Sequence, residues 1–152
     1  MWTDLMLDRV VNDQSIVEGI ARVLGVRSGD IALVDEIGEQ FGVMSQNPPI
    51  IIERAQLAGS FPLQLSISLR RSDLEQRICD PADEQAVIAR LCAGWECSAL
   101  FSDDALNPYS WFLMTPTGRL EEVTVDAGRL DDQDAFVITR VNRIVRQVPV
   151  VA

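Results

Sequence analysis

Lysine and histidine are absent from this chain of 152 residues. All 13 basic residues are therefore arginines, and they face 23 aspartates and glutamates, for a formal net charge of −10. Without histidine there is no Ser/His or Cys/His nucleophile pair, and without lysine there is no Schiff-base amine and no P-loop lysine. These absences exclude the commonest catalytic chemistries, so we predict a protein that is not an enzyme.

Cysteine is also scarce, with Cys79, Cys92 and Cys97 as an odd set of three. A small secreted domain normally carries paired cysteines, so this set favours a reducing cytosol. Neither a second cysteine pair nor a histidine completes a tetrahedral zinc site around Cys92 and Cys97, and we expect no metal. Dinucleotide and P-loop glycine motifs are missing too, so we expect no cofactor.

The chain has no long apolar run and no basic N-terminal segment. Its first residues, Met1-Trp2-Thr3-Asp4, carry an acid where a signal peptide carries positive charge. No apolar stretch approaches the ~18 residues that span a bilayer. We therefore expect a cytoplasmic protein with no membrane partner.

What the chain does have is the composition of a globular domain. Hydrophobic residues make up 47% and charged residues 24%, which is typical of a packed core with a solvated surface. The length fits one core, because domains of this size are the commonest. We predict a single globular α+β domain over residues 1–152.

The first half of the chain contains one clear strand pattern. Apolar and polar residues alternate over residues 61–69, which predicts a strand with one buried face. A short apolar run over residues 31–34 and a β-branched run over residues 50–54 also predict strands. Ser15 and Glu18 have the spacing of a capping box, which predicts a helix that Gly25 ends. Residues 4–11 fit either a helix or a strand.

The second half alternates between the same two element types. Asp80-Pro81 predicts a helix start, and its apolar face includes Cys92, which we assign to the core. Strands are expected over residues 96–101, 110–115 and 119–126, the last two joined by a hairpin at Gly118. Residues 137–148 carry a helical apolar stripe, although their β-branched residues also permit a strand. Together these elements predict a mainly antiparallel sheet packed against helices.

The acidic clusters of the second half do not have catalytic or metal-binding spacing. Glu121 and Glu122 are adjacent on a predicted strand, so they point to opposite faces and do not flank one substrate bond. Asp131-Asp132-Gln133-Asp134 lacks the spacing of a calcium loop. We interpret that cluster as the start of the last helix, with Arg140, Arg143 and Arg146 near the C-terminal end of the same helix.

One segment combines acids, turn residues and large aromatics. It runs from residue 103 to residue 111, and we predict that it binds a protein partner through Asp103, Asp104, Asn107, Tyr109 and Trp111, together with Glu122. Aromatic side chains beside charge are typical of interface hot spots. The alternative is that Tyr109 and Trp111 pack beneath the loop.

The layout of residues 83–126 resembles immunity proteins of bacterial polymorphic and contact-dependent toxin systems. The resemblance rests on the helix through Leu91-Cys92, the strand region 95–104, the turn Asn107-Pro108-Tyr109 and the hairpin of residues 115–119. It implies a small acidic cytosolic domain that binds and blocks a cognate toxin. Many toxins are basic enzymes, and opposite charge speeds their association with an acidic inhibitor.

The acidic surface therefore favours a basic protein partner and disfavours nucleic acid, which needs a cationic face. A second class of protein fits the same composition: a dimeric secretion chaperone, or another acidic binding module, that holds an effector segment. An enzyme that uses carboxylates or a thiol is the third interpretation. The sequence alone leaves the oligomeric state open.

Overall fold

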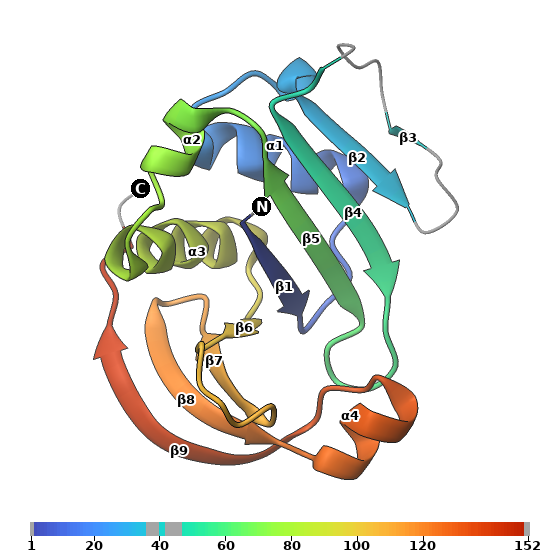
Figure 1. Ribbon diagram of the computed structural model, residues 1–152, viewed down its shortest axis with the longest axis vertical. Helices are drawn as coiled ribbons and strands as arrows, with labels where there is room; N and C mark the ends of the chain where they lie inside the picture. The colour runs from blue at the N-terminus through green and yellow to red at the C-terminus, as the bar shows by residue number, and fades with distance from the viewer. Residues whose placement is uncertain (1, 36–39, 42–46, 151–152) are drawn as a thin grey trace.

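A computed structural model describes residues 2–35, 40–41 and 47–150, and it confirms the α+β class (Figure 1). The strands of this part of the chain form one nine-stranded sheet in the order β3-β2-β4-β5-β1-β6-β7-β8-β9. Neighbouring strands are antiparallel except for the parallel pair β2 and β4. The prediction of a mainly antiparallel sheet is confirmed.

The first half of the chain supplies β1 (Thr3–Leu7), α1 (Asp13–Leu24), β2 (Ile31–Asp35), β3 (Gln40–Phe41), β4 (Ile50–Gln56) and β5 (Leu63–Leu69), with a short 3-10 turn at Ser28–Asp30. The second half supplies α2 (Ser72–Gln76), α3 (Pro81–Trp95), β6 (Ala99–Ser102), β7 (Ser110–Met114), β8 (Arg119–Val125), α4 (Ala127–Gln133) and β9 (Ile138–Gln147).

The ambiguous segment near the N-terminus forms the strand β1, which lies between β5 and β6 in the sheet. The prediction that Ser15 caps the first helix was wrong, whereas the predicted end of that helix was right. Helix α1 begins at Asp13, and its cap is Asn12, whose side chain accepts a hydrogen bond from the Ser15 amide at 2.8 Å. Ser15 therefore lies inside the first turn, and the helix ends at Gly25 as predicted, in a left-handed conformation with φ 68°.

Two other expectations for the first and middle parts of the chain are confirmed. Strand β5 alternates buried and partly exposed residues along its whole length, and Pro62 lies just before it, where no ladder hydrogen bond is lost. Helix α3 begins at Pro81 with Asp80 as its cap, whose carboxylate accepts from the Asp83 amide at 2.9 Å.

Helices α1 and α3 pack together on one face of the sheet, with α1 behind β4 and β5 in Figure 1. The main core lies between this helical layer and the sheet. Gly19 of α1 permits the close approach, because a Cβ there would lie 2.4 Å from Trp95 Nε1. That indole nitrogen donates to the Ser15 carbonyl at 2.9 Å and thus joins the end of α3 to the start of α1.

A second, smaller core lies on the opposite face of the sheet. Its buried members are Met6, Phe61, Leu100, Leu113, Val123, Val125 and Phe136. Side chains that pack partly buried against it come from the loop before β7, from α4 and from the start of β9. The sheet is thus covered by long helices on one face and by loops and a short helix on the other.

The helical interpretation of residues 137–148 is wrong, because most of this segment is the edge strand β9. Its pairing with β8 shifts register at three places. Each shift leaves one residue of β9 without a partner, which is a β-bulge. The bulge residues are Thr139, Asn142 and Val145. The bulges convert the usual period of two into a period of three, which a sequence analysis mistakes for one face of a helix.

The interpretation of the last acidic cluster is also wrong. Asp131 and Asp132 lie near the C-terminal end of α4, which begins after the cap Asp126 and ends at Asp134 in a left-handed conformation. The cluster therefore does not start a helix. Arg140, Arg143 and Arg146 lie on the strand β9, so their positive charge does not stabilise the C-terminal end of a helix as we expected.

Candidate protein-binding surface

The loop of residues 103–109 joins β6 to β7, and we name it the acidic loop. The two aromatics at its end pack partly buried against the smaller core. The Trp111 ring meets Phe136 edge-on at a centroid distance of 5.1 Å, and its Nε1 donates to the Pro108 carbonyl at 3.0 Å. Tyr109 and Trp111 thus support the loop from below, as the packing alternative expected, while part of each ring is exposed.

The acidic loop is held by its own side chains. Asp103 accepts from the Ala105 amide at 3.0 Å with one carboxylate oxygen and from the Ser110 hydroxyl with the other. Asn107 accepts from the Tyr109 amide at 3.0 Å. Such side-chain turns fix a loop without regular secondary structure. These hydrogen bonds restrict the conformations that the loop can adopt.

Leu106 is the exposed apolar residue of the acidic loop, and its side chain is fully open to solvent. Asp104 and Asn107 beside it are also exposed. Full burial of a leucine side chain in a partner would contribute about 1.5–3 kcal/mol. The sequence analysis missed Leu106 because an apolar residue among turn residues has no periodicity from which exposure can be inferred.

Helix α4 adds further carboxylates to this surface. The Tyr109 hydroxyl donates to Asp131 Oδ2 at 2.7 Å, and this hydrogen bond to the carboxylate raises the pKa of Tyr109. The bond joins the acidic loop to the end of α4, where Asp132 and Asp134 are exposed. We name the combination of the acidic loop and residues 131–134 the acidic tip.

Glu122 does not belong to the acidic tip. It lies opposite Phe112 in the sheet register, on the face that the helices cover, whereas Trp111 lies opposite Val123 on the other face. The Glu122 carboxylate pairs with Arg143 Nε at 3.2 Å. The structure thus brings together the predicted residues of the loop and places Glu122 on the other side of the sheet.

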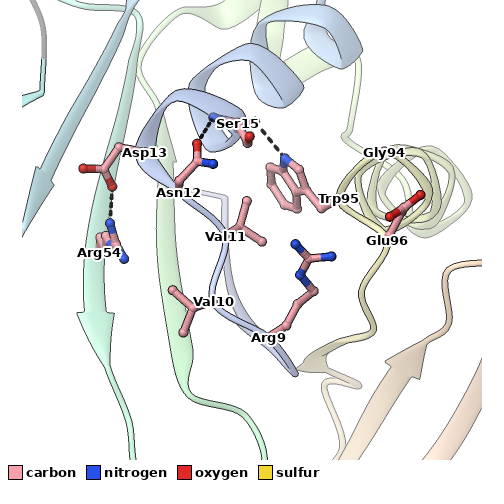
Figure 2. A pocket seen from close by; sticks show the side chains of 10 residues that line it. All are labelled: Arg9, Val10, Val11, Asn12, Asp13, Ser15, Arg54, Gly94, Trp95 and Glu96. Carbon is pink, nitrogen blue, oxygen red and sulfur yellow. Dashed lines mark hydrogen bonds and ion pairs between the residues drawn. The ribbon is translucent and has the colours of Figure 1, made fainter.

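A cavity of about 470 Å³ opens between the start of α1 and the end of α3 (Figure 2). Figure 2 shows Arg9 and Glu96 on one side of it and the ion pair of Arg54 with Asp13 on the other. Two guanidinium groups and two carboxylates leave this cavity without net charge. Ser15, Asp13 and Glu96 also line it, and the Asp13 carboxylate is paired with the Arg54 guanidinium.

Two of the three thiols are buried, and Cys79 is exposed. Cys92 and Cys97 are buried in the main core, which confirms the assignment of Cys92. A hydrogen bond with the Cys97 thiol, together with burial, holds the pKa of Cys92 well above its ordinary value. A reactive thiol needs the opposite shift. Within residues 2–35, 40–41 and 47–150, no group of three or more metal-binding side chains comes together.

Two further results bear on the site. None of the helices in the described ranges combines the length and the apolar character needed to cross a membrane. Comparison of the chain with protein-family models, with curated proteins and with solved structures finds no match.

Proposed function

We propose that this chain is a cytoplasmic inhibitor of the immunity-protein class, which neutralises a basic bacterial toxin by direct binding. The observation that carries the proposal is the acidic tip: a fully exposed Leu106 on a hydrogen-bonded loop, beside Asp104 and the carboxylates of α4. A preorganised apolar anchor with a charged rim is the usual anatomy of a tight protein interface.

The two parts of the acidic tip have different roles in binding. The carboxylates steer a basic partner toward the surface, which raises the association rate at low salt. Leu106 and the exposed parts of Tyr109 and Trp111 become buried in the complex, and their loss raises the dissociation rate. Asp103 serves the loop itself, because both of its oxygens accept hydrogen bonds within residues 103–110.

The test is co-expression with the toxin domain encoded by the neighbouring gene, followed by binding kinetics at two salt concentrations. We expect the chain to restore growth and to bind with a salt-sensitive association rate. Leu106→Ala should raise the dissociation rate by about 10-fold or more, and Asp104→Asn with Asp132→Asn should slow association. Glu18→Gln with Glu75→Gln, on exposed positions of α1 and α2, is the charge-matched control.

A dimeric secretion chaperone is the competing proposal, and one observation favours it. Val141 and Ile144, on the edge strand β9, are 50% and 62% exposed, and a second copy could cover them. Light scattering separates the two functions. An obligate dimer that binds an effector segment and leaves toxin activity intact would overturn the immunity proposal, and so would a toxin that binds the tip variants as tightly as the unchanged chain.

A further inference from the structure

The bulges of β9 gather three arginines on one face of the edge strand. Residues opposite one another in an antiparallel pair share a face. The arginines lie opposite alternate residues of β8, as the pairs Leu120–Arg146, Glu122–Arg143 and Thr124–Arg140. Because Leu120 packs in the main core, this is the helix-covered face of the sheet. We name the three side chains the arginine row.

Each guanidinium of the arginine row is held by its Nε nitrogen. Arg140 Nε donates to Asn142 Oδ1 at 2.7 Å, and Arg143 Nε donates to Glu122 Oε2 at 3.2 Å. Arg146 donates to Gln85 Oε1 of α3 from Nε at 3.0 Å and from Nη2 at 2.5 Å, so its Nη1 takes no part in this contact. A guanidinium has further N–H donors on its terminal nitrogens. The row therefore keeps donors for a ligand while its side chains are already oriented.

The charge of the arginine row is only partly compensated. Of these three arginines, only Arg143 has a carboxylate within ion-pair distance among the described residues, while the acceptors of Arg140 and Arg146 are neutral amides. All three residues are exposed. In a chain of net charge −10, this row is a local cationic strip on the sheet face opposite the acidic tip.

We propose that the arginine row is a second protein-binding surface and that it binds an extended acidic segment of a partner. Alternate residues of β8 set the spacing of the row, about 6–7 Å along the strand. Alternate side chains of an extended peptide have the same spacing, so carboxylates at every second position can each meet one guanidinium. Carboxylates also match the paired N–H donors of arginine. This inference does not depend on the toxin or on the acidic tip.

Nucleic acid is the less favoured ligand of the row. A long polyanion would also experience the repulsion of the whole acidic surface, whereas a short acidic segment meets the strip alone. The two ligands are separated by direct competition. The probe is a fluorescein-labelled peptide with glutamate at alternate positions and serine between them, and the competitor is a short oligothymidylate with the same charge.

The experiment is fluorescence anisotropy at low ionic strength with intact protein. We expect the peptide to bind and to be released by salt, and the variant R140Q/R143Q/R146Q to bind at least about 10-fold more weakly. The control R27Q/R70Q/R129Q, which removes three exposed arginines elsewhere, should bind as the unchanged chain does. If the triple variant does not fold, Arg140→Gln replaces it, because that guanidinium bonds within β9.

Several results would overturn the proposal. They are absence of binding at low salt, equal binding by the triple variant and the control, and tighter binding of the oligothymidylate than of the peptide. If the triple variant aggregates and the unchanged chain binds no peptide, the arginines serve only to protect the sheet edge, which is the known role of charge on edge strands.

Discussion

Strands β5 and β9 belong to the same sheet but differ in burial and in the regularity of their pairing. Strand β5 lies between β4 and β1, alternates strictly between buried and partly exposed residues, and pairs with β4 without a register shift. Strand β9 lies at the edge, is almost entirely exposed, and shifts register against β8 three times. A strand inside a sheet is constrained by a neighbour on each side, whereas an edge strand tolerates bulges on its one paired side.

The two strands therefore have different roles in the protein. The regular strand orders the main core through Leu63, Leu65, Ile67 and Leu69. The bulged strand contributes little to burial and instead displays arginines on one face and apolar side chains on the other. Bulges and charge also discourage edge-to-edge aggregation. The candidate binding surfaces accordingly lie in the half of the sheet that contains β7, β8 and β9.

The largest expected difference between the two strands comes from deleting one residue in each. Deletion of Ser66 turns the rest of β5 over, so the buried Ile67 and Leu69 would face solvent. At about 1.5–3 kcal/mol for each of these two side chains, the loss is comparable to the lower end of the stability of a domain, about 5–15 kcal/mol. We expect this variant to show no cooperative unfolding in urea.

Deletion of Asn142 is the matched change in β9. It removes a bulge residue that has no partner on β8, so every other pair of the two strands is retained. The hydrogen bonds of Asn142 with Thr124 and Arg140 are lost, and we expect a cost of about 1–2 kcal/mol. Equal destabilisation by the two deletions would show that β9 is not a regularly bulged strand.

Truncation of single side chains should give a smaller difference between the two strands. Leu65→Ala removes a fully buried side chain and should cost about 2–5 kcal/mol. Ile144→Ala removes a side chain of the same size that is 62% exposed, and Ser66→Ala changes the solvated face of β5; each should cost about 0.5 kcal/mol or less. Denaturant melts measure all three. Similar values for Leu65→Ala and Ile144→Ala would contradict the burial difference.

The smallest effect concerns pH and Glu84, a half-buried residue of α3. Burial, with the negative charge of Asp104 as a second cause, raises the pKa of Glu84 above its ordinary value of 4.5. The unfolded chain therefore ionises more readily, and stability falls as the pH rises from 4.5 through the raised pKa. Glu84→Gln should raise the melting temperature at neutral pH but not at pH below 4.5.

Asp104→Asn should reproduce part of that gain, because it removes one of the two causes of the shift. Glu75→Gln on α2 is the control for a change of one charge at an exposed position. A Glu84→Gln variant that loses stability equally at every pH would contradict this account. It would mean that the Glu84 carboxyl group stabilises the fold as a hydrogen-bond acceptor, whatever its charge.

The elements with strong local signals were predictable from the sequence. The alternation of β5, the Asp80-Pro81 start of α3 and the Gly25 end of α1 each depend on a rule that operates within a few residues. The start of α1 was misplaced because Asn12 and Ser15 are both good caps, and the choice depends on where the preceding chain leaves β1. The sequence alone does not contain that geometry.

The errors of the second half also have a physical cause. A bulge at every third residue gives β9 the same apolar spacing as a helix, and only the pairing with β8 distinguishes the two. For the same reason the acids at the end of α4 were assigned to the start of a helix over residues 137–148, a segment that is mostly the strand β9. The acidic loop was found from its composition, but the exposure of Leu106 and the contact of Tyr109 with Asp131 depend on tertiary structure.

The most direct test of the central claim is hydrogen exchange of the chain alone and in complex with the toxin domain that co-expression identifies as its partner. The proposed function predicts slower exchange in the acidic loop and in α4, with no change in β4 or β5. Protection confined to β2 and β4, or protection that leaves residues 103–109 and 127–134 unchanged, would contradict the assignment of the acidic tip as the inhibitory surface.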